Sequence, residues 1–206
     1  ILYIGFSSGL SGTFSSSLIA AEILKEKYPD SEIICTDTLA ASMGEGLLVY
    51  YAAKMKQEGK SIHEVSQWVV DNRLKLCQWF TVDDLNHLKR GGRINAMTAT
   101  LGTALNVKPI LHVDDEGHLI PAYNVRGRKK SINALLEKME ELCVNPEEQT
   151  VFISHADSLE DTQYLADMIK EKLHVKEVII NFIGPVIGSH TGQGAIALFF
   201  IGKSRK

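Results

Sequence analysis

The stretch IGFSSGLSGTFSSSL, residues 4–18, places seven serine and threonine hydroxyls and three glycines directly behind a short apolar run. The run itself, ILYIGF at residues 1–6, is typical of a strand that is buried on both faces of a parallel sheet. Behind the glycines, apolar residues recur at helical spacing from Phe14 to Leu24. The stretch therefore predicts a strand-to-helix turn that is built from small hydroxyl residues.

Strands and helices alternate along the rest of the first part of the chain. A second short strand is expected at 32–36 and a helix at 40–58. The next helix opens with SIHE at 61–64, a capping box, and is expected to run to about residue 75. This order of elements predicts a parallel α/β sheet covered by helices as a first domain, residues 1–75.

The pattern changes after residue 75. Two strand-like runs flank DDEG, so residues 108–125 are expected to form a β-hairpin around a glycine-containing turn. A strand–helix–strand passage follows at 150–183, then a second glycine-rich loop at 184–195 and a closing strand. A hairpin mixed with such passages predicts a second domain, residues 76–206, with a mixed sheet. The fold class is therefore α/β with two domains.

Composition excludes several classes of protein. Of 206 residues, 45% are hydrophobic and 23% are charged, and the net charge of -3 predicts no general affinity for nucleic acid. Cys35, Cys77 and Cys143 form no CxxC pair, which indicates reduced thiols and favours a cytoplasmic protein. No two histidines have the i, i+4 spacing of a zinc helix, so we expect no metal site.

The hydroxyl cluster has three interpretations. Helix capping explains one or two hydroxyls, but not five of them within residues 7–15. The segment GFSSG at 5–9 also matches the G-x-S-x-G turn of hydrolases, with Ser7 or Ser8 as nucleophile and His190 as base. We favour the third, an anion or carboxylate site, because small residues let ligand oxygens approach the N–H groups at the positive end of a helix.

Two further segments carry polar groups that suit an anion. In GSHTGQG, residues 188–194, His190 and Thr191 lie in a glycine-rich loop at the expected end of a strand, where α/β sheets bind ligands. A histidine there can donate to a carboxylate and change its charge near neutral pH. In LKRGGRI, residues 88–94, Arg93 lies beside two glycines, and its planar fork of donors suits carboxylates and phosphates.

Taken in order, these motifs resemble the DegV family of bacterial fatty-acid-binding proteins. The likeness extends over nearly the whole chain and its segments follow the order of the family. The matching stretches are SSGLSGTF (7–14), FTVDDLNHLKRGGRI (80–94), LGTALNVKPIL (101–111), GHLIPAYNVRGRKK (117–130) and GPVIGSHTGQGA (184–195).

The resemblance implies a two-domain α/β protein that buries one long-chain fatty acid in an apolar tunnel between its domains. The fatty acid is the ligand, and no other cofactor is implied. Burying its tail contributes roughly 0.8 kcal/mol per CH₂ group. The family's carboxylate-binding positions correspond here to Ser7, Ser8, Ser11, Thr13, His190 and Thr191.

The resemblance also implies a partner. In the family an ATP-dependent fatty acid kinase phosphorylates the bound acid to an acyl phosphate for phospholipid metabolism. Arg93 and Arg126 are expected on the face that meets this kinase. Because the kinase carries out the phosphorylation, the resemblance implies that the present chain is a non-catalytic, cytoplasmic binding subunit. Transient contact with a membrane is compatible with that role, and no nucleic acid is expected.

Two other functions stay open at this point: a serine hydrolase that acts on an acyl substrate, and a regulatory module that binds small anions without an acyl tunnel. Family members also carry an earlier segment with an aspartate-serine strand end and a threonine/serine-proline loop that contacts the carboxylate. We therefore expect a further segment of this kind before Ile1.

Overall fold

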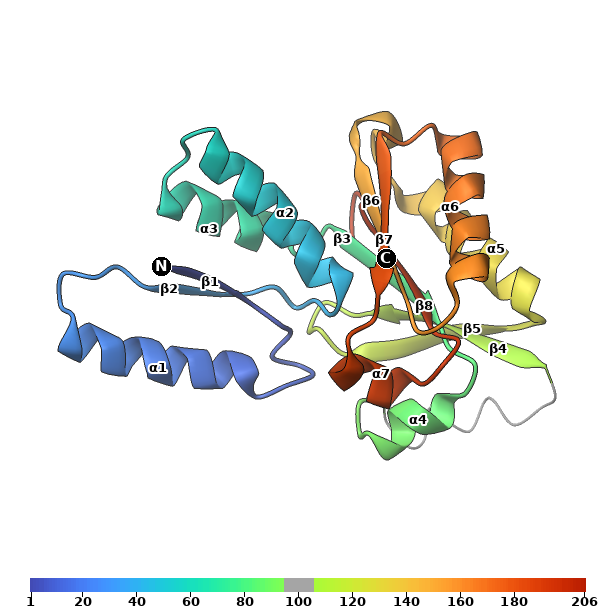
Figure 1. The fold of residues 1–206 in the computed structure, drawn as a ribbon, viewed down its shortest axis with the longest axis horizontal. Helices are drawn as coiled ribbons and strands as arrows, with labels where there is room; N and C mark the ends of the chain where they lie inside the picture. Colours follow the sequence, from blue (N-terminus) through green and yellow to red (C-terminus); the bar gives the residue numbers. More distant parts are fainter. Residues whose placement is uncertain (95–105) are drawn as a thin grey trace.

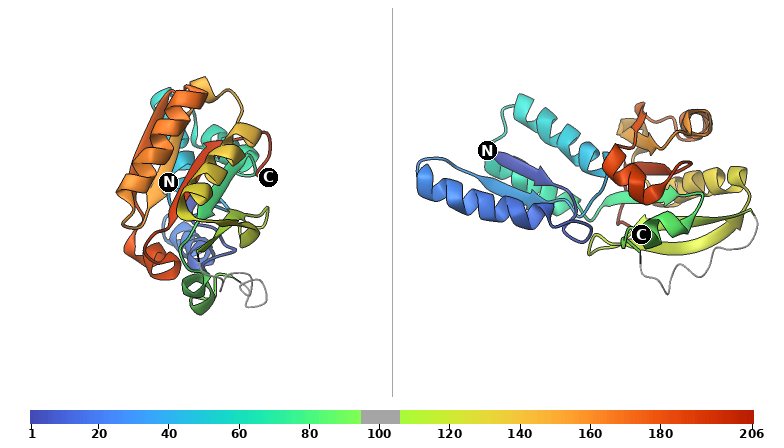
Figure 2. Two further views of the ribbon diagram at one scale, coloured as in Figure 1. Left: turned by 90° about the vertical axis from the view of Figure 1, so that its right-hand side faces the viewer. Right: turned by 60° about the horizontal axis from the view of Figure 1, so that its bottom comes forward.

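A computed structural model describes residues 1–94 and 106–206 and contains two sheets that lie side by side along the molecule (Figures 1 and 2). In the smaller sheet, β1 (Leu2–Gly5) and β2 (Ile34–Asp37) are parallel. Helices cover both sides of this pair in Figure 1, with α1 (Thr13–Lys27) on the side opposite α2 (Met43–Gln57) and α3 (Ile62–Asn72).

The larger sheet has six strands in the order β5-β4-β3-β8-β6-β7. Only β6 and β7 pair in parallel, and the other neighbours are antiparallel, so the mixed α/β architecture predicted from the sequence is confirmed. The strands are β3 (Leu76–Thr81), β4 (Val107–Val113), β5 (Leu119–Arg126), β6 (Thr150–His155), β7 (Glu177–Phe182) and β8 (Ile196–Ile201). The accompanying helices are α4 (Leu85–Arg90), α5 (Arg128–Leu142), α6 (Leu159–Leu173), α7 (Pro185–Thr191) and the short 3₁₀ turn η2 (Pro146–Glu148).

Successive side chains of β3 point to opposite faces of the larger sheet. Cys77 and Trp79 belong to the apolar cluster formed with α5 and α6. Phe80 packs on the other face with Leu85 and Leu88 of α4, and the buried amide of Gln78 lies on that face too. Side chains two residues apart therefore share a face of β3, and both faces of this strand are covered.

Helix α2 packs against both sheets. Its buried Leu47 and Leu48 belong to one apolar cluster with Phe152 and Phe199 of the larger sheet, and Ile4 of β1 packs against the same cluster. The two sheets therefore share one core beneath α2.

The predicted capping box and hairpin are confirmed. Ser61 accepts a hydrogen bond from the Glu64 backbone, and the Glu64 carboxylate accepts one from the Ser61 N–H at 2.8 Å. Strands β4 and β5 pair around the turn that contains Gly117. The predicted parallel pairing of the first two strands is also found.

The first strand is less buried than predicted. Ile1 is 73% exposed, and three of the four residues of β1 are only partly buried. In the described residues β1 pairs only with β2. On α1, Ala21 is the one buried residue, while Leu18 and Leu24 are 45% and 37% exposed.

The glycine-rich segment at 184–195 is also not the continuous loop that was predicted. Its first part forms α7, because Pro185 at the first position fixes φ at a helical value and leaves no N–H unsatisfied. Gly188 continues the helix, and Gly192 ends it with φ of 74°.

The division between residues 75 and 76 stays a prediction, although α3 ends at Asn72 and the first strand of the larger sheet begins at Leu76. Residues 101–105 of the family-like stretch LGTALNVKPIL lie outside the described residues. In the parts of the chain that are described, no helix combines the length and apolar character needed to cross a bilayer.

Burial raises the pKa of Glu45, in the first turn of α2, to about 7. The folded protein therefore holds this proton more tightly than the unfolded chain, and the free energy of unfolding falls as the pH rises from about 4.5 to about 7. We expect Glu45→Gln to raise the free energy of unfolding by about 1 to 2 kcal/mol near pH 8 and to have little effect near pH 4.

Urea unfolding of the wild type and the variant at both pH values measures this difference. Glu58→Gln, which removes an exposed carboxyl at the end of the same helix, is the matched control. An equal effect of Glu45→Gln at both pH values would contradict the prediction.

Candidate functional site

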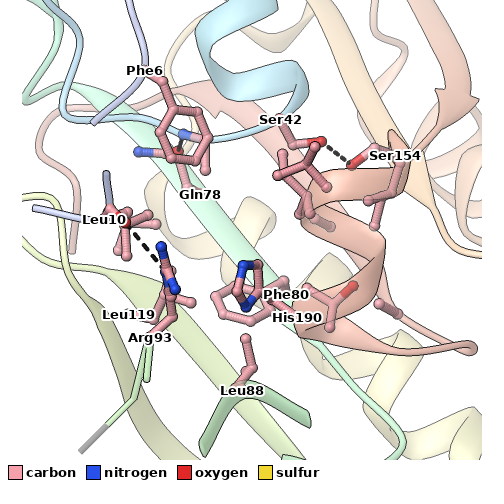
Figure 3. A pocket seen from close by; sticks show the side chains of 18 of the residues that line it. Phe6, Leu10, Ser42, Gln78, Phe80, Leu88, Arg93, Leu119, Ser154 and His190 are labelled. Atoms are coloured by element: carbon pink, nitrogen blue, oxygen red, sulfur yellow. Dashed lines mark hydrogen bonds between the residues drawn. The ribbon is translucent and has the colours of Figure 1, made fainter. Parts of the chain in front are cut away.

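A cavity of about 330 Å³ lies against the face of the larger sheet that carries Gln78 and Phe80 (Figure 3). Its walls come from the hydroxyl loop behind β1, the residues just before α2, five strands of the larger sheet, α4 and α7. Most of the lining is apolar, and the size falls in the range of small-molecule sites. The larger apolar side chains are Phe6, Leu10, Phe80, Leu88, Val113, Leu119, Ile183, Val186, Ile187, Ile196 and Phe199.

Arg93 and His190 are the only ionisable side chains among the described residues that line the cavity. Arg93 follows α4 and extends to the hydroxyl loop, where its Nε donates to the Leu10 carbonyl at 3.3 Å. Its Nη1 donates to the carbonyl of Gly91 at 2.6 Å. The guanidinium therefore connects the glycine turn after α4 with the loop behind β1, at the edge of an apolar cavity.

Two glycines allow α7 to lie close to α4. A Cβ on Gly91 would lie 2.1 Å from His190 Nδ1, a distance that no real contact adopts. A Cβ on Gly192 would lie 2.8 Å from His87 Cδ2, and its φ of 74° also favours glycine. The absence of a side chain at residue 91 therefore determines where the His190 ring lies.

The hydroxyl loop supplies polar atoms at the start of α1. Ser11 Oγ and Thr13 Oγ1 are 2.8 Å apart, and Ser11 Oγ also accepts from the Thr13 N–H at 3.2 Å. Both residues line the cavity, and no acidic side chain occupies the first turn of α1. Hydroxyls beside the positive end of a 15-residue helix suit a negatively charged group.

Ser7 and Ser8 occupy the same loop but do not line the cavity. Ser7 is fully buried, and its hydroxyl donates to the Gly117 carbonyl at 2.9 Å and accepts from the Gly9 N–H at 3.2 Å. Ser8 is exposed, and its backbone N–H donates to Asp37 Oδ1 at 3.3 Å. Ser7 therefore fastens the loop to the turn of the hairpin.

Thr191 and Arg126 differ in their placement. Thr191 is 8% exposed and lines the cavity, and its buried Oγ1 has no hydrogen-bond partner in the described residues. Arg126 is exposed at the last position of β5, the end remote from the hairpin turn, and is not part of the cavity wall. The structure thus gathers four of the predicted residues around the cavity together with Arg93: Ser11, Thr13, His190 and Thr191.

Three polar residues of the cavity wall were not predicted from the sequence: Ser42, Gln78 and Ser154. Ser42 Oγ donates to Ser154 Oγ at 3.0 Å, and Gln78 lies on the same sheet face as Phe80. Alternation along LCQWFT could have placed Gln78 beside Phe80, since residues two apart share a face. No local pattern marks Ser42, whose φ of 54° is set by contacts distant in sequence.

A family model described as an uncharacterised protein of the DegV family matches residues 1–203. The chain belongs to the DegV family. A DegV domain-containing protein of Clostridium perfringens is 55% identical over 206 residues, which are 100% of this chain and 71% of that protein.

Solved DegV structures agree with this assignment. One from Thermus thermophilus, named for its fatty acid binding, is 31% identical with a TM-score of 0.87, and the match covers 98% of this chain and 70% of that one. The Fatty Acid Kinase (Fak) B3 protein of Streptococcus pneumoniae, loaded with linoleic acid, has the same fold, with a TM-score of 0.90 at 21% identity over 98% and 72% of the two chains. The resemblance found in the sequence is confirmed.

The hydrolase alternative finds no support in this DegV chain. A nucleophilic serine needs a hydroxyl within reach of its base. The Ser7 hydroxyl is buried against the Gly117 carbonyl, and Ser8 is exposed outside the cavity wall. His190, in contrast, lies against Gly91 in the cavity wall.

We expect Gly91→Ala to displace the His190 ring by about 1 Å or more, because the new methyl group would occupy the place of Nδ1. Histidine-ring NMR spectra of the purified protein report this change as a shift of the His190 signal, which His190→Gln assigns. Gly188→Ala in α7 is the matched control, since a Cβ there meets nothing within 4 Å. An unmoved His190 signal in Gly91→Ala would show that the ring does not depend on this contact.

Proposed function

We propose that this protein binds one long-chain fatty acid in the cavity, with the acyl chain along the apolar wall and the carboxylate between Arg93 and His190. The observation that carries the proposal is the distribution of charge. The cavity is mostly apolar, and in the described residues its two ionisable groups are a guanidinium and an imidazole, with no carboxylate among them. An amphiphile with an anionic end matches that distribution.

The cavity would stabilise both the acyl chain and the carboxylate of such a ligand. Burying the tail contributes roughly 0.8 kcal/mol per CH₂ group. A carboxylate taken out of water needs charged or hydrogen-bonding partners, which the Arg93 fork and the hydroxyls can provide. The proposed headgroup residues are Ser11, Thr13, His190 and Thr191 with Arg93, which all line the cavity. Ser7 contributes by fixing the loop through its bond to Gly117, and Ser8 lies in the same loop outside the cavity wall.

Two relatives support this choice. The Thermus thermophilus protein is named for fatty acid binding and is 31% identical over most of this chain. A DegV protein of Bacillus subtilis, 30% identical with a TM-score of 0.81, is likewise called a fatty acid binding protein. We transfer the ligand class from them to this chain.

We further propose that the bound acid is presented to an ATP-dependent kinase in the cytoplasm. A carboxylate oxygen would attack the γ-phosphorus of ATP, forming the acyl phosphate while the bond to ADP breaks. The kinase would supply ATP and the catalytic groups, so this chain would act as a non-catalytic carrier. Arg93 and Arg126, both exposed, are the proposed contacts with the kinase. The name of the Fak B3 protein, which shares this fold, supports that partner.

Entry and exit of the acid would involve transient membrane contact. Val186 lines the cavity and is 75% exposed, and Phe182, a few residues earlier, is 67% exposed. Apolar side chains at the opening of a lipid site favour contact with acyl chains outside it.

Mass spectrometry of an organic extract tests the ligand. We expect about one fatty acid per molecule of full-length protein purified from bacteria. His190→Ala should weaken binding of an added fatty acid about ten-fold or more, because a hydrogen bond to a charged group is lost. His118→Ala removes an exposed histidine of the hairpin turn outside the cavity and should leave binding unchanged.

Absence of any fatty acid from the folded wild type, together with no binding of added acid, would overturn the proposed ligand. Binding of small anions alone would instead support the regulatory module considered above.

The kinase contact has its own test. With a fatty acid bound and the kinase of the same organism added, Arg126→Ala should slow ATP-dependent formation of acyl phosphate about ten-fold, because an arginine contact is lost from the interface. Fatty acid binding should not change, since Arg126 lies outside the cavity wall. Lys130→Ala, which removes a nearby exposed charge, is the control. Equal rates for Arg126→Ala and the wild type would exclude this contact.

A further inference from the structure

A pair of hydroxyls lies in the apolar wall of the cavity, apart from the proposed headgroup residues. Ser154 belongs to β6 and is fully buried, and Ser42 is the residue before α2. Ser42 Oγ donates to Ser154 Oγ at 3.0 Å, and both residues line the cavity. In Figure 3 this pair lies on the opposite side of the view from Arg93 and Leu10, with Phe80 and His190 between them.

Ser42 adopts an unfavourable backbone conformation and does not cap the helix that follows it. A serine in the N-cap position ordinarily accepts a hydrogen bond from a backbone N–H of the first turn. The Ser42 side chain makes no such bond, and its backbone has φ of 54°, in the left-handed region that residues with a side chain rarely adopt. The hydroxyl is held toward Ser154 in the cavity wall in place of capping α2.

The hydroxyl hydrogen of Ser154 remains available for a hydrogen bond to a third group. Two serine hydroxyls carry two hydrogens, and one of them forms the bond from Ser42 to Ser154. In the described residues no acceptor receives the hydrogen of Ser154. Gln78, the other polar neighbour in the wall, already binds the loop through both ends of its amide, to Ala41 N–H and the Leu39 carbonyl. The buried pair can therefore donate one further hydrogen bond to an acceptor in the cavity.

The chemistry of that partner follows from the absence of charge. A buried carboxylate needs a cation or several donors, and the ionisable side chains of the described cavity wall are Arg93 and His190, which belong to the proposed headgroup site. Two neutral hydroxyls instead match a neutral oxygen, which can accept the Ser154 hydrogen and, as a hydroxyl, donate to a free lone pair of the pair.

We propose that this pocket selects fatty acids that carry a neutral oxygen function, a hydroxyl or a ketone, partway along the acyl chain, bound by the Ser42–Ser154 pair. This inference rests on the proposed function, since it takes the carboxylate to lie between Arg93 and His190. The pair then fixes a second point of the chain and sets which carbon may carry the oxygen.

A displacement assay in the full-length protein tests the inference. The probes are octadecanoic acid and a set of its monohydroxy derivatives with the hydroxyl at successive positions along the chain. We expect the isomer whose hydroxyl meets the pair to bind about ten-fold more tightly than the other isomers, whose hydroxyls lie unpaired against the apolar wall. In Ser154→Ala that ratio should fall below about two-fold, and Ser42→Ala should lower it as well.

Ser66→Ala is the matched control. It breaks a similar hydroxyl pair, in which Ser66 Oγ lies 2.9 Å from Thr36 Oγ1, and Ser66 does not line the cavity. The ratio should stay at its wild-type value in this variant.

The outcomes separate the two proposals. If octadecanoic acid binds but no isomer is preferred, or if the preference survives in Ser154→Ala, the fatty acid function stands and this inference is overturned. If neither octadecanoic acid nor any derivative binds, the proposed function fails and the inference fails with it.

Discussion

The side-chain amide of Gln78 holds the loop on which both α2 and the cavity depend. It is 1% exposed, its Oε1 accepts from the Ala41 N–H at 3.1 Å, and its Nε2 donates to the Leu39 carbonyl at 3.2 Å. Leu39 and Ser42 in this loop have φ of 50° and 54°, conformations that cost on the order of 1 to 3 kcal/mol each unless their surroundings enforce them. Gly44 completes the arrangement, since a Cβ there would lie 2.7 Å from Gln78 Oε1. A polar side chain of the larger sheet therefore determines how the helix shared by both sheets begins.

Hydrogen bonds from two other buried side chains, Ser7 and Arg205, also connect separate parts of the chain. Ser7 binds the Gly117 carbonyl at the hairpin turn. Arg205, 1% exposed, donates to the Asp114 carbonyl of the same turn at 2.6 Å and to the Arg73 carbonyl after α3. Burial lowers the pKa of Arg205 to about 10, which leaves it protonated at neutral pH. A buried donor or acceptor that is left unpaired costs free energy. These hydrogen bonds therefore specify the position of the hairpin turn more narrowly than apolar packing alone could.

Local signals in the sequence predicted most of the elements, and contacts between distant residues account for what it missed. The capping box SIHE, the hairpin around DDEG and the strand–helix–strand passage at 150–183 depend on neighbours in the chain, and the structure has all three. The exposure of β1 and the partnership of Ser42 with Ser154 depend on residues far away in sequence. The same holds for the site. Motifs identified the segments that surround the cavity, but only the fold shows that Ser7 supports the loop while Ser11 and Thr13 line the cavity.

The strand order of the larger sheet affects how the protein is made. β8, the last strand in the chain, is a central one: it lies between β3 and β6, and Leu76 pairs with Ile201. A ribosome that adds about 5 to 20 residues per second needs on the order of ten seconds to synthesise the chain between these two partners. Throughout that interval the edge of β3 that pairs with β8 has no native partner, and the edge of β6 is in the same position from its own synthesis until β8 is made. Until β8 is made, those edges expose unpaired N–H and C=O groups that can pair with other chains.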